Sequence, residues 1–374
     1  MLDDIAQAVL AREEVVKYLR GNDGARGDHA RERICGYLDE LRTTQRPAIY
    51  RALQHPLYPI LRKIERLPEH IHHVQTAVRE GHRIVYASNH RSHTDYLVEP
   101  LAIDDNGIRP PLIAAGINLF GGPLGLLHRY VTGAIPIRRN ARDPAYHITL
   151  KAYVAEMLNK HDLFFYPEGG RSYSGELKLT KSGLIHAALT ANRSDLVIVP
   201  AAVAYDLVLE DHVLARQRVK KQQRPFTREL AEMVRYAVGY RSRAFVTFGA
   251  PIPAADCDPQ SRTDVLALTR LVRARIGALY KVLPTALFAA AMRPSITRRD
   301  LESRIDQLLE ELAAKRANLG VASGRQAVEE AAEPLETRGV VVLENDRFRV
   351  RERNVLRYYA RSIEHLLVTP GRPH

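Results

Sequence analysis

Short apolar runs alternate with amphipathic segments through the middle of the chain. The run RIVYAS at residues 83–88 is rich in β-branched residues and ends in a polar turn, so it predicts a strand. Residues 146–160, by contrast, predict a helix, and another helix is predicted to start near Ser92. Further strands are predicted at residues 110–116, 133–139, 162–166, 196–205 and 244–252. Strands that alternate with helices predict an α/β fold with a mixed central sheet flanked by helices.

The two ends of the chain show helical periodicity. Apolar residues recur at three- and four-residue spacing in residues 1–75, which predicts an N-terminal helical region. At the other end, residues 295–374 contain an amphipathic helix, a hairpin that turns at Glu344–Asn345–Asp346, and a final helix. This order predicts a helix-hairpin-helix extension of the winged-helix type. The α/β domain then occupies residues 76–294.

Composition places the chain among globular proteins with negatively charged partners. Hydrophobic residues make up 45% of the 374 residues, and the formal net charge is +12. Such an excess favours phosphorylated substrates, anionic lipid surfaces, acidic carrier proteins or nucleic acid. The two cysteines, Cys35 and Cys257, lie far apart in sequence, so neither a disulfide framework nor a zinc site is indicated. A reducing cytosol is the expected compartment.

The sequence gives little sign of a leader or a membrane span. The first twenty residues are acidic at the start and charged throughout, unlike a signal peptide. Residues 111–127 are uncharged, but their glycines and prolines disfavour a long helix. We therefore expect any membrane contact to be peripheral.

The densest polar cluster is NHRSHTD at residues 89–95, where a predicted strand meets a predicted helix. Open α/β sheets place their sites at such strand ends. The spacing lets the Asp95 carboxylate reach one nitrogen of His90 and leaves the other nitrogen to act as a general base. An alternative is that His90 and Asp95 only cap the helix. A metal site is a second alternative, although no further His/Cys cluster follows downstream.

Two further clusters are suited to an anion. Residues 165–172 read FYPEGGRS, in which the glycines allow backbone N–H groups to approach a ligand and the arginine suits phosphate. The adjacent arginines of GAIPIRR point to opposite sides if the strand continues, so we expect one of them to reach a shared pocket. The candidate binding residues of these two clusters are Arg138, Arg139, Glu168, Gly169, Gly170, Arg171, Ser172 and the following Lys181.

The absence of a covalent nucleophile simplifies the chemistry. No serine lies in a GxSxG motif and neither cysteine has a catalytic context. A base, several cations and a glycine-rich loop therefore favour direct attack by a phosphorylated alcohol, with no covalent enzyme intermediate.

The order of the clusters resembles the bacterial membrane-associated glycerol-3-phosphate acyltransferases, in the HxxxxD glycerolipid acyltransferase superfamily. HRSHTD, GAIPIRR, EGGRS and IVPAAVAYD resemble its four sequence blocks in order. Tyr173 departs from the basic residue expected after EGGRS, and Lys178 or Lys181 would compensate. The resemblance implies that His90 activates the sn-1 hydroxyl of glycerol 3-phosphate for attack on acyl-CoA or acyl carrier protein. It implies that Arg138 or Arg139, with Arg171 and Lys181, holds the phosphate. It also implies that the reaction needs no metal or organic cofactor.

The product of such a reaction is an amphiphile, so we expect peripheral docking at the cytoplasmic face of the cell membrane. Candidate surfaces are residues 111–127, 282–292 and the basic residues 216–243. Transfer to lysophosphatidate or dihydroxyacetone phosphate is the nearest alternative function. A nucleic-acid-binding protein and a metallohydrolase are more distant ones, and we expect no nucleic-acid partner.

Overall fold

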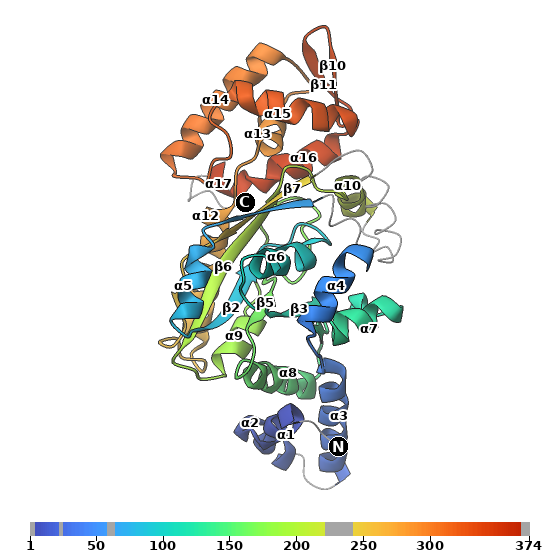
Figure 1. Ribbon diagram of the computed structural model, residues 1–374, viewed down its shortest axis with the longest axis vertical. Coiled ribbons are helices and arrows are strands. Elements are labelled where there is room, and N and C mark those ends of the chain that lie inside the picture. Colours follow the sequence, from blue (N-terminus) through green and yellow to red (C-terminus); the bar gives the residue numbers. More distant parts are fainter. Residues whose placement is uncertain (1–3, 22–24, 58–63, 221–241, 368–374) are drawn as a thin grey trace.

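The computed structural model describes residues 4–21, 25–57, 64–220 and 242–367. Among them, eight strands form the central sheet in the order β1-β7-β6-β2-β5-β3-β4, with β8 beside β6 (Figure 1). The five strands from β6 to β4 are mutually parallel, whereas β7 is antiparallel to β6. The predicted mixed sheet is thus confirmed. The strands are β1 (Ile64–Glu69), β2 (Arg83–Ser88), β3 (Leu112–Gly116), β4 (Ala134–Ile137), β5 (Leu163–Phe165), β6 (Leu196–Tyr205), β7 (Ser242–Phe248) and β8 (Ile252–Pro253).

Each central strand buries both of its faces, in two separate cores. In β2, Ile84 and Tyr86 pack into one core, while Val85 and Ala87 pack into the other. Successive side chains of a strand point to opposite faces, so this alternation places helices on both sides of the sheet. Such double burial explains why the strands read as continuous apolar runs in the sequence.

Helices from different parts of the chain cover the two faces. The first core includes residues of α5 and α6, and the second includes residues of α1, α2, α3, α8, α9 and α12. Helices α1 to α3 pack on α8 at one end of the molecule (Figure 1). The helices are α1 (Asp4–Ala11), α2 (Glu13–Arg20), α3 (Ala25–Leu41), α4 (Pro47–Leu57), α5 (His72–Arg79), α6 (Asp95–Asp104), α7 (Gly122–Tyr130), α8 (Pro144–Met157), α9 (Gly183–Leu189), α10 (Asp211–Lys220) and α12 (Arg262–Leu279), with a short 3-10 turn η2 (Ile117–Leu119).

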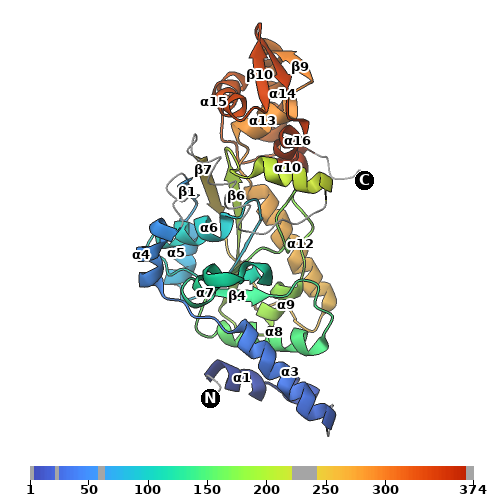
Figure 2. The same ribbon diagram turned by 90° about the vertical axis from the view of Figure 1, so that its right-hand side faces the viewer.

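The last described residues, 284–367, form what we call the C-terminal module. It lies at the opposite end of the molecule from α1 to α3 (Figure 2). Strands β9, β10 and β11 form a small antiparallel sheet in the order β10-β11-β9. Its elements follow the order helix–strand–helix–helix–hairpin–helix, so the predicted amphipathic helix, hairpin and final helix are present. The elements are α13 (Pro284–Ala291), β9 (Ser295–Thr297), α14 (Arg298–Ala314), α15 (Gly324–Thr337), β10 (Val341–Glu344), β11 (Arg347–Val350), α16 (Arg353–Ser362) and α17 (Glu364–Leu367).

The predicted hairpin turn is confirmed in detail. Asn345 and Asp346 lie between β10 and β11 with φ of 50° and 58°. Two consecutive residues at positive φ are the requirement of the tight hairpin turn that matches strand twist, and Asn and Asp tolerate that conformation.

Three predicted boundaries differ in the structure. Strand β1 lies within residues 1–75, which were expected to be helical. It is an edge strand that pairs only with β7 in the described residues. Its sequence, IERLPE, lacks an apolar run. Helix α13 lies within residues 76–294 but packs on α14, α15 and α16. Helix α6 begins at Asp95 instead of near Ser92. Residues 93 and 94 form a turn before it, and the Ser92 N–H donates to the Asp95 carboxylate across this turn.

The burial of α13 excludes one of the expected membrane-docking surfaces. Its residues from Pro284 to Ala289, together with Ala291, are buried. Residues 282–292 are therefore core and not a docking surface, because their uncharged side chains pack inside the C-terminal module.

Candidate active site

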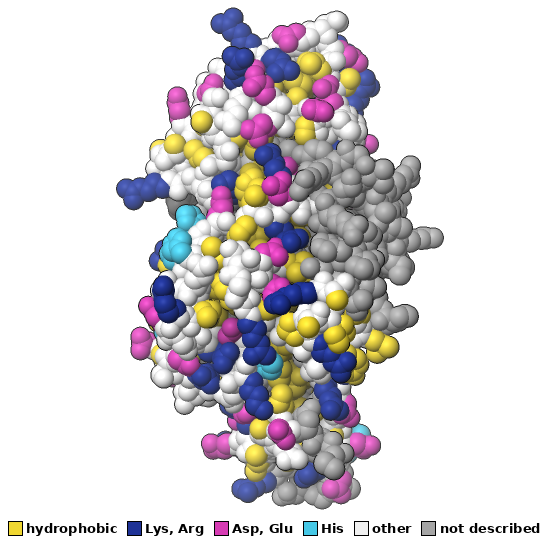
Figure 3. Space-filling model, in the orientation of Figure 1, with side chains coloured by type: hydrophobic (Ala, Val, Ile, Leu, Met, Phe, Trp, Pro, Cys, Tyr) yellow, Lys and Arg dark blue, Asp and Glu magenta, His cyan; other side chains and the backbone are white. Residues whose placement is uncertain are grey.

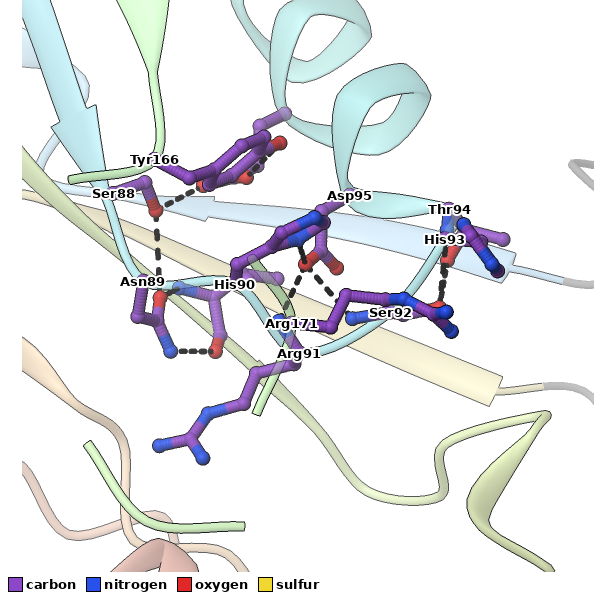
Figure 4. Close-up of polar contacts among 12 residues, drawn as sticks. Ser88, Asn89, His90, Arg91, Ser92, His93, Thr94, Asp95, Tyr166 and Arg171 are labelled. Atoms are coloured by element: carbon purple, nitrogen blue, oxygen red, sulfur yellow. Dashed lines mark hydrogen bonds and ion pairs between the residues drawn. The ribbon is translucent and has the colours of Figure 1, made fainter. Parts of the chain in front are cut away.

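The polar loop between β2 and α6 holds His90 and Asp95 in contact. The His90 Nδ1 donates to Asp95 Oδ2 over 2.8 Å (Figure 4). The same oxygen accepts from the backbone N–H groups of Arg91 and Ser92, over 2.6 and 2.8 Å. The Tyr205 hydroxyl donates to the other oxygen, Oδ1, over 2.7 Å. The Asp95 carboxylate is fully buried and satisfied, so it fixes both the orientation and the tautomer of the imidazole.

The loop itself is anchored to the neighbouring strand. The Asn89 side chain donates to the carbonyl of Val203 over 3.0 Å and accepts from its N–H over 2.7 Å. This amide pairs with β6 as another strand residue would, where β2 has ended at Ser88. The backbone that leads into His90 is therefore held in place at the carboxyl end of the parallel strands.

An aromatic ring supports the imidazole from one side. The Tyr166 ring stacks on His90, with ring centroids 4.1 Å apart. Its hydroxyl donates to Glu99 Oε2 over 2.9 Å, and Ser88 Oγ donates to Glu99 Oε1 over 2.5 Å. Burial, followed by the nearby Asp95 charge, raises the pKa of Glu99 well above its ordinary value.

The EGGRS loop follows β5 and brings cations to the same place. Gly169 has φ of +70°, which glycine adopts without strain, and a side chain there would meet the stem of Lys181 at 3.1 Å. The Arg139 guanidinium lies between two glycines: an added Cβ would be 2.9 Å from it at Gly116 and 3.4 Å at Gly170. The glycines thus allow Arg139 to lie against the backbone at the end of β3.

Arg171 also lines the pocket. Its Nη1 is 3.8 Å from the Glu210 carboxylate, and its guanidinium lies over the Tyr173 ring. Glu210 is completely buried and accepts from the His93 N–H over 2.6 Å and from the Ser92 hydroxyl over 2.9 Å. Glu210 therefore connects the HxxxxD loop to the arginine of EGGRS.

These groups line one pocket that combines polar and apolar residues. Arg139, Arg171, Gly169 and Gly170 line it together with His90. The complete lining is His90, His93, Tyr96, Ile113, Ala114, Ala115, Gly116, Asn118, Leu119, Ile137, Arg139, Tyr166, Gly169, Gly170, Arg171, Tyr173 and Leu184. An anionic group and an acyl chain can therefore meet beside one imidazole.

Burial shifts the proton affinities of the site in a direction that suits base chemistry. Burial lowers the pKa of His90 below its ordinary value, Arg171 and Arg139 lower it further, and Asp95 opposes them. The neutral imidazole with Nδ1–H bonded to Asp95 has its lone pair on Nε2. At neutral pH this nitrogen can accept a proton from a hydroxyl in the pocket.

The structure divides the predicted binding residues into two groups. Arg139, Gly169, Gly170 and Arg171 line the pocket with His90, and Lys181 lies against Gly169. Arg138 does not line it, because its guanidinium pairs with Glu40 of α3 and lies over the Tyr37 ring.

Glu168 and Ser172 are also absent from the lining and support the loops instead. The Glu168 carboxylate is buried and accepts from the His90 N–H over 3.4 Å. The Ser172 hydroxyl donates to the carbonyl of Glu176 over 2.7 Å, and its N–H donates to the carbonyl of His90 over 2.9 Å. Lys178 donates to the carbonyl of Gly170 over 3.1 Å.

Some supporting residues were missed by the sequence reasoning. Tyr166 and Tyr205 lie within quoted motifs, so their position could have suggested a role. Glu99 and Glu210 are more distant from any motif, and the contact of Glu210 with Ser92 spans 118 residues.

The metal alternative finds no support in the described part of the chain. There, no group of three His, Cys, Asp or Glu side chains is placed to hold a metal ion. His90 uses its Nδ1 for Asp95.

Comparison with known proteins agrees with the order of these motifs. Residues 69–204 match the sequence profile of the family described as Acyltransferase. These residues belong to the acyltransferase family. The acyltransferase-family region contains His90, Asp95, Arg139 and Arg171, and it ends within β6.

Two curated relatives extend the likeness beyond this region. The chain is 32% identical over 340 residues to a glycerol-3-phosphate acyltransferase of Actinobacillus succinogenes, covering 81% of this chain and 41% of that protein. It is 29% identical over 319 residues to a glycerol-3-phosphate acyltransferase of Aeromonas hydrophila, covering 77% of this chain and 39% of that protein. The chain thus spans about two fifths of the length of these relatives.

A solved structure is also similar to part of the chain. It is the 1-acyl-sn-glycerophosphate (LPA) acyltransferase PlsC from Thermotoga maritima, with a TM-score of 0.34, 13% identity, and coverage of 57% of this chain and 70% of that one. None of the helices in the described residues combines the length and the apolar character needed to cross a bilayer.

Proposed function

We propose that the protein transfers a fatty acyl chain from acyl-CoA or acyl carrier protein to the sn-1 hydroxyl of glycerol 3-phosphate, giving lysophosphatidate. The observation that carries the proposal is the His90–Asp95 pair, whose imidazole lines the same pocket as Arg139 and Arg171. A base beside two guanidinium groups suits an alcohol that carries a phosphate. The names of the two curated relatives support the same acceptor.

In the proposed reaction His90 Nε2 removes the proton from the acceptor hydroxyl. The hydroxyl oxygen attacks the thioester carbonyl, and backbone N–H groups stabilise the resulting oxyanion. Collapse of this intermediate breaks the carbon–sulfur bond, and the imidazolium returns its proton to the thiolate. Arg139 and Arg171 hold the phosphate, with Lys181 nearby, and the apolar residues Ile113, Leu119 and Ile137 face the acyl chain.

The test compares the wild type with His90→Ala, using palmitoyl-CoA and each of three acceptors: glycerol 3-phosphate, lysophosphatidate and dihydroxyacetone phosphate. Thiol release and the lipid product are both measured. We expect acylation of glycerol 3-phosphate by the wild type and a loss of about 100-fold or more in the variant, as removal of a general base requires. Activity on lysophosphatidate alone would mean that lysophosphatidate, and not glycerol 3-phosphate, is the acceptor. If no acyl chain is transferred from CoA or carrier-protein donors with lipid present, the enzyme function is rejected.

We further propose peripheral contact of the protein with the cytoplasmic face of the membrane through η2 and α7. Ile117, Leu126 and Tyr130 are 40%, 61% and 37% exposed there, next to the pocket-lining Leu119. Figure 3 shows hydrophobic and basic side chains together over α7. Most of the basic residues 216–243 lie outside the described residues.

Cosedimentation with vesicles containing anionic lipid tests this surface. Leu126→Asp should reduce binding, whereas Leu271→Asp on α12, where the leucine is 41% exposed, should not. Equal binding by both variants would contradict the proposed surface.

A further inference from the structure

The order helix–strand–helix–helix–hairpin of the C-terminal module resembles that of winged-helix domains, in which the third helix, here α15, enters the DNA groove. The exposed side chains of α15 include Glu329 and Glu333, and Arg325 is paired to Glu329 over 2.9 Å. An acidic helix repels phosphate, so α15 does not suit such a groove.

The module contacts the segment that joins β6 to α10, residues 206–211. The Tyr359 hydroxyl of α16 accepts from the Val208 N–H over 3.0 Å and donates to Asp211 Oδ2 over 2.7 Å. Arg338 donates to the carbonyls of Val208 and Leu209 over 3.2 and 3.1 Å and pairs with Asp211. Two side chains of the module therefore hold the backbone just before Glu210 and the side chain of Asp211 just after it.

Glu210 transmits this attachment to the pocket. Its buried carboxylate is bonded to Ser92 and His93 and lies 3.8 Å from Arg171, as described above. A shift of segment 206–211 would move the ion pair that holds the Arg171 guanidinium. Buried side chains with such charged partners tolerate little displacement, because a misplaced partner leaves a desolvated charge.

We propose that the C-terminal module acts on the acceptor site: through Tyr359 and Arg338 it fixes Glu210, and Glu210 positions Arg171 for the acceptor phosphate. Glu210 and Tyr359 are positioning residues, since neither lines the pocket. The inference rests on the proposed use of Arg171 for that phosphate.

Steady-state kinetics on four proteins test the connection: wild type, Tyr359→Phe, Glu210→Gln and the double variant. Tyr359→Phe removes the hydroxyl and keeps the ring, and Asp211 retains Arg338 as a partner. We expect the KM for glycerol 3-phosphate to rise about fivefold in each single variant, with the KM for palmitoyl-CoA within about twofold of the wild type. In the Glu210→Gln background, Tyr359→Phe should add less than about twofold, because both substitutions act on one connection.

Ile305→Val supplies the control for general loss of stability. Ile305 is fully buried in α14, and this substitution should lower the unfolding temperature without changing the KM for glycerol 3-phosphate. An unchanged KM in Tyr359→Phe, or the same effect of Tyr359→Phe in both backgrounds, would overturn the inference. If the wild type acylates lysophosphatidate alone, the proposed acceptor fails, and the same four proteins then decide the inference through the KM for lysophosphatidate, which also carries a phosphate.

Discussion

The Tyr166 ring lies nearly parallel to the His90 imidazole, with an angle of 12° between the two planes and 4.1 Å between their centroids. A general base becomes a cation when it takes a proton, and an aromatic face stabilises a cation lying over it. The hydroxyl of Tyr166 is bonded to Glu99, so the ring is held against the imidazole from behind. The stack therefore favours the protonated state that His90 reaches during transfer.

Replacing the ring should separate this effect from that of the hydroxyl. Tyr166→Leu should lower kcat about tenfold, from the loss of roughly 1–2 kcal/mol of cation–π stabilisation. It should also move the acidic limb of the kcat/KM profile to lower pH, because the imidazolium becomes less stable. Tyr166→Phe keeps the ring and should retain most of the activity. If Phe were as damaging as Leu, the Glu99 hydrogen bond and not the stack would be the important contact.

Loss of the Asp95 charge should lower kcat far more than loss of the hydrogen bond that the Tyr205 hydroxyl donates to Asp95. Asp95→Asn places an amide where the carboxylate accepts from His90, Arg91 and Ser92, so we expect kcat to fall about 100-fold or more. Tyr205→Phe removes one hydrogen bond from the same carboxylate without touching His90 and should cost about fivefold or less. Similar losses in both variants, measured as kcat, would show that Asp95 acts through loop stability alone.

The two adjacent arginines, Arg138 and Arg139, allow a test of the phosphate site with a matched control. Arg139→Ala should raise the KM for glycerol 3-phosphate about 10- to 100-fold, as expected for the loss of a charge-assisted contact. Arg138→Ala should change it less than about twofold, because Arg138 forms a half-exposed pair with Glu40 outside the pocket. Initial rates across a range of acceptor concentrations give both values. The opposite ranking would contradict the assignment of Arg139 to the phosphate.

The pH dependence follows from the burial of His90. Its pKa is lowered by burial and by Arg171 and Arg139, so the base remains neutral below pH 6.5 and kcat/KM should decline only below that value. Arg139→Met removes a cation that lowers this pKa, so the acidic limb should move to higher pH. Burial also raises the pKa of Glu210 to about 7. A limb near pH 7 that disappears in Glu210→Gln belongs to Glu210, while a limb that persists and responds to Arg139→Met belongs to His90.

Local patterns predicted much of the fold and part of the site. The buried strands were predictable because both of their faces are apolar, and the contact of His90 with Asp95 was predictable because it spans five residues. Strand β1 was not predictable, because its sequence IERLPE has no apolar run. It forms a strand by pairing with β7. The choice between Arg138 and Arg139 depends on the strand's orientation, and the contact of Tyr205 with Asp95 spans 110 residues, so neither has a local signal.

The packing of α16 against the loop after Ser172 can be measured with two glycines. Gly175 and Gly107 have φ of +86° and +74°, so alanine strains both backbones by roughly 1–2 kcal/mol. A Cβ at Gly107 would meet nothing within 4 Å, whereas one at Gly175 would lie 1.9 Å from the carbonyl oxygen of Tyr358 in α16. The Cβ is fixed to the backbone of the loop and the carbonyl oxygen belongs to the backbone of α16. No side-chain rotation can relieve this contact, so the loop or the helix must move.

Gly175→Ala should therefore lower the free energy of unfolding by at least about 3 kcal/mol, against about 1 kcal/mol for Gly107→Ala, in urea titrations. It should also lower kcat/KM for glycerol 3-phosphate at least tenfold, because the displaced loop carries Arg171 at its start, while Gly107→Ala should retain the wild-type value. Equal destabilisation by the two substitutions, with activity retained in both, would mean that the loop moves away from α16 without consequence for the pocket.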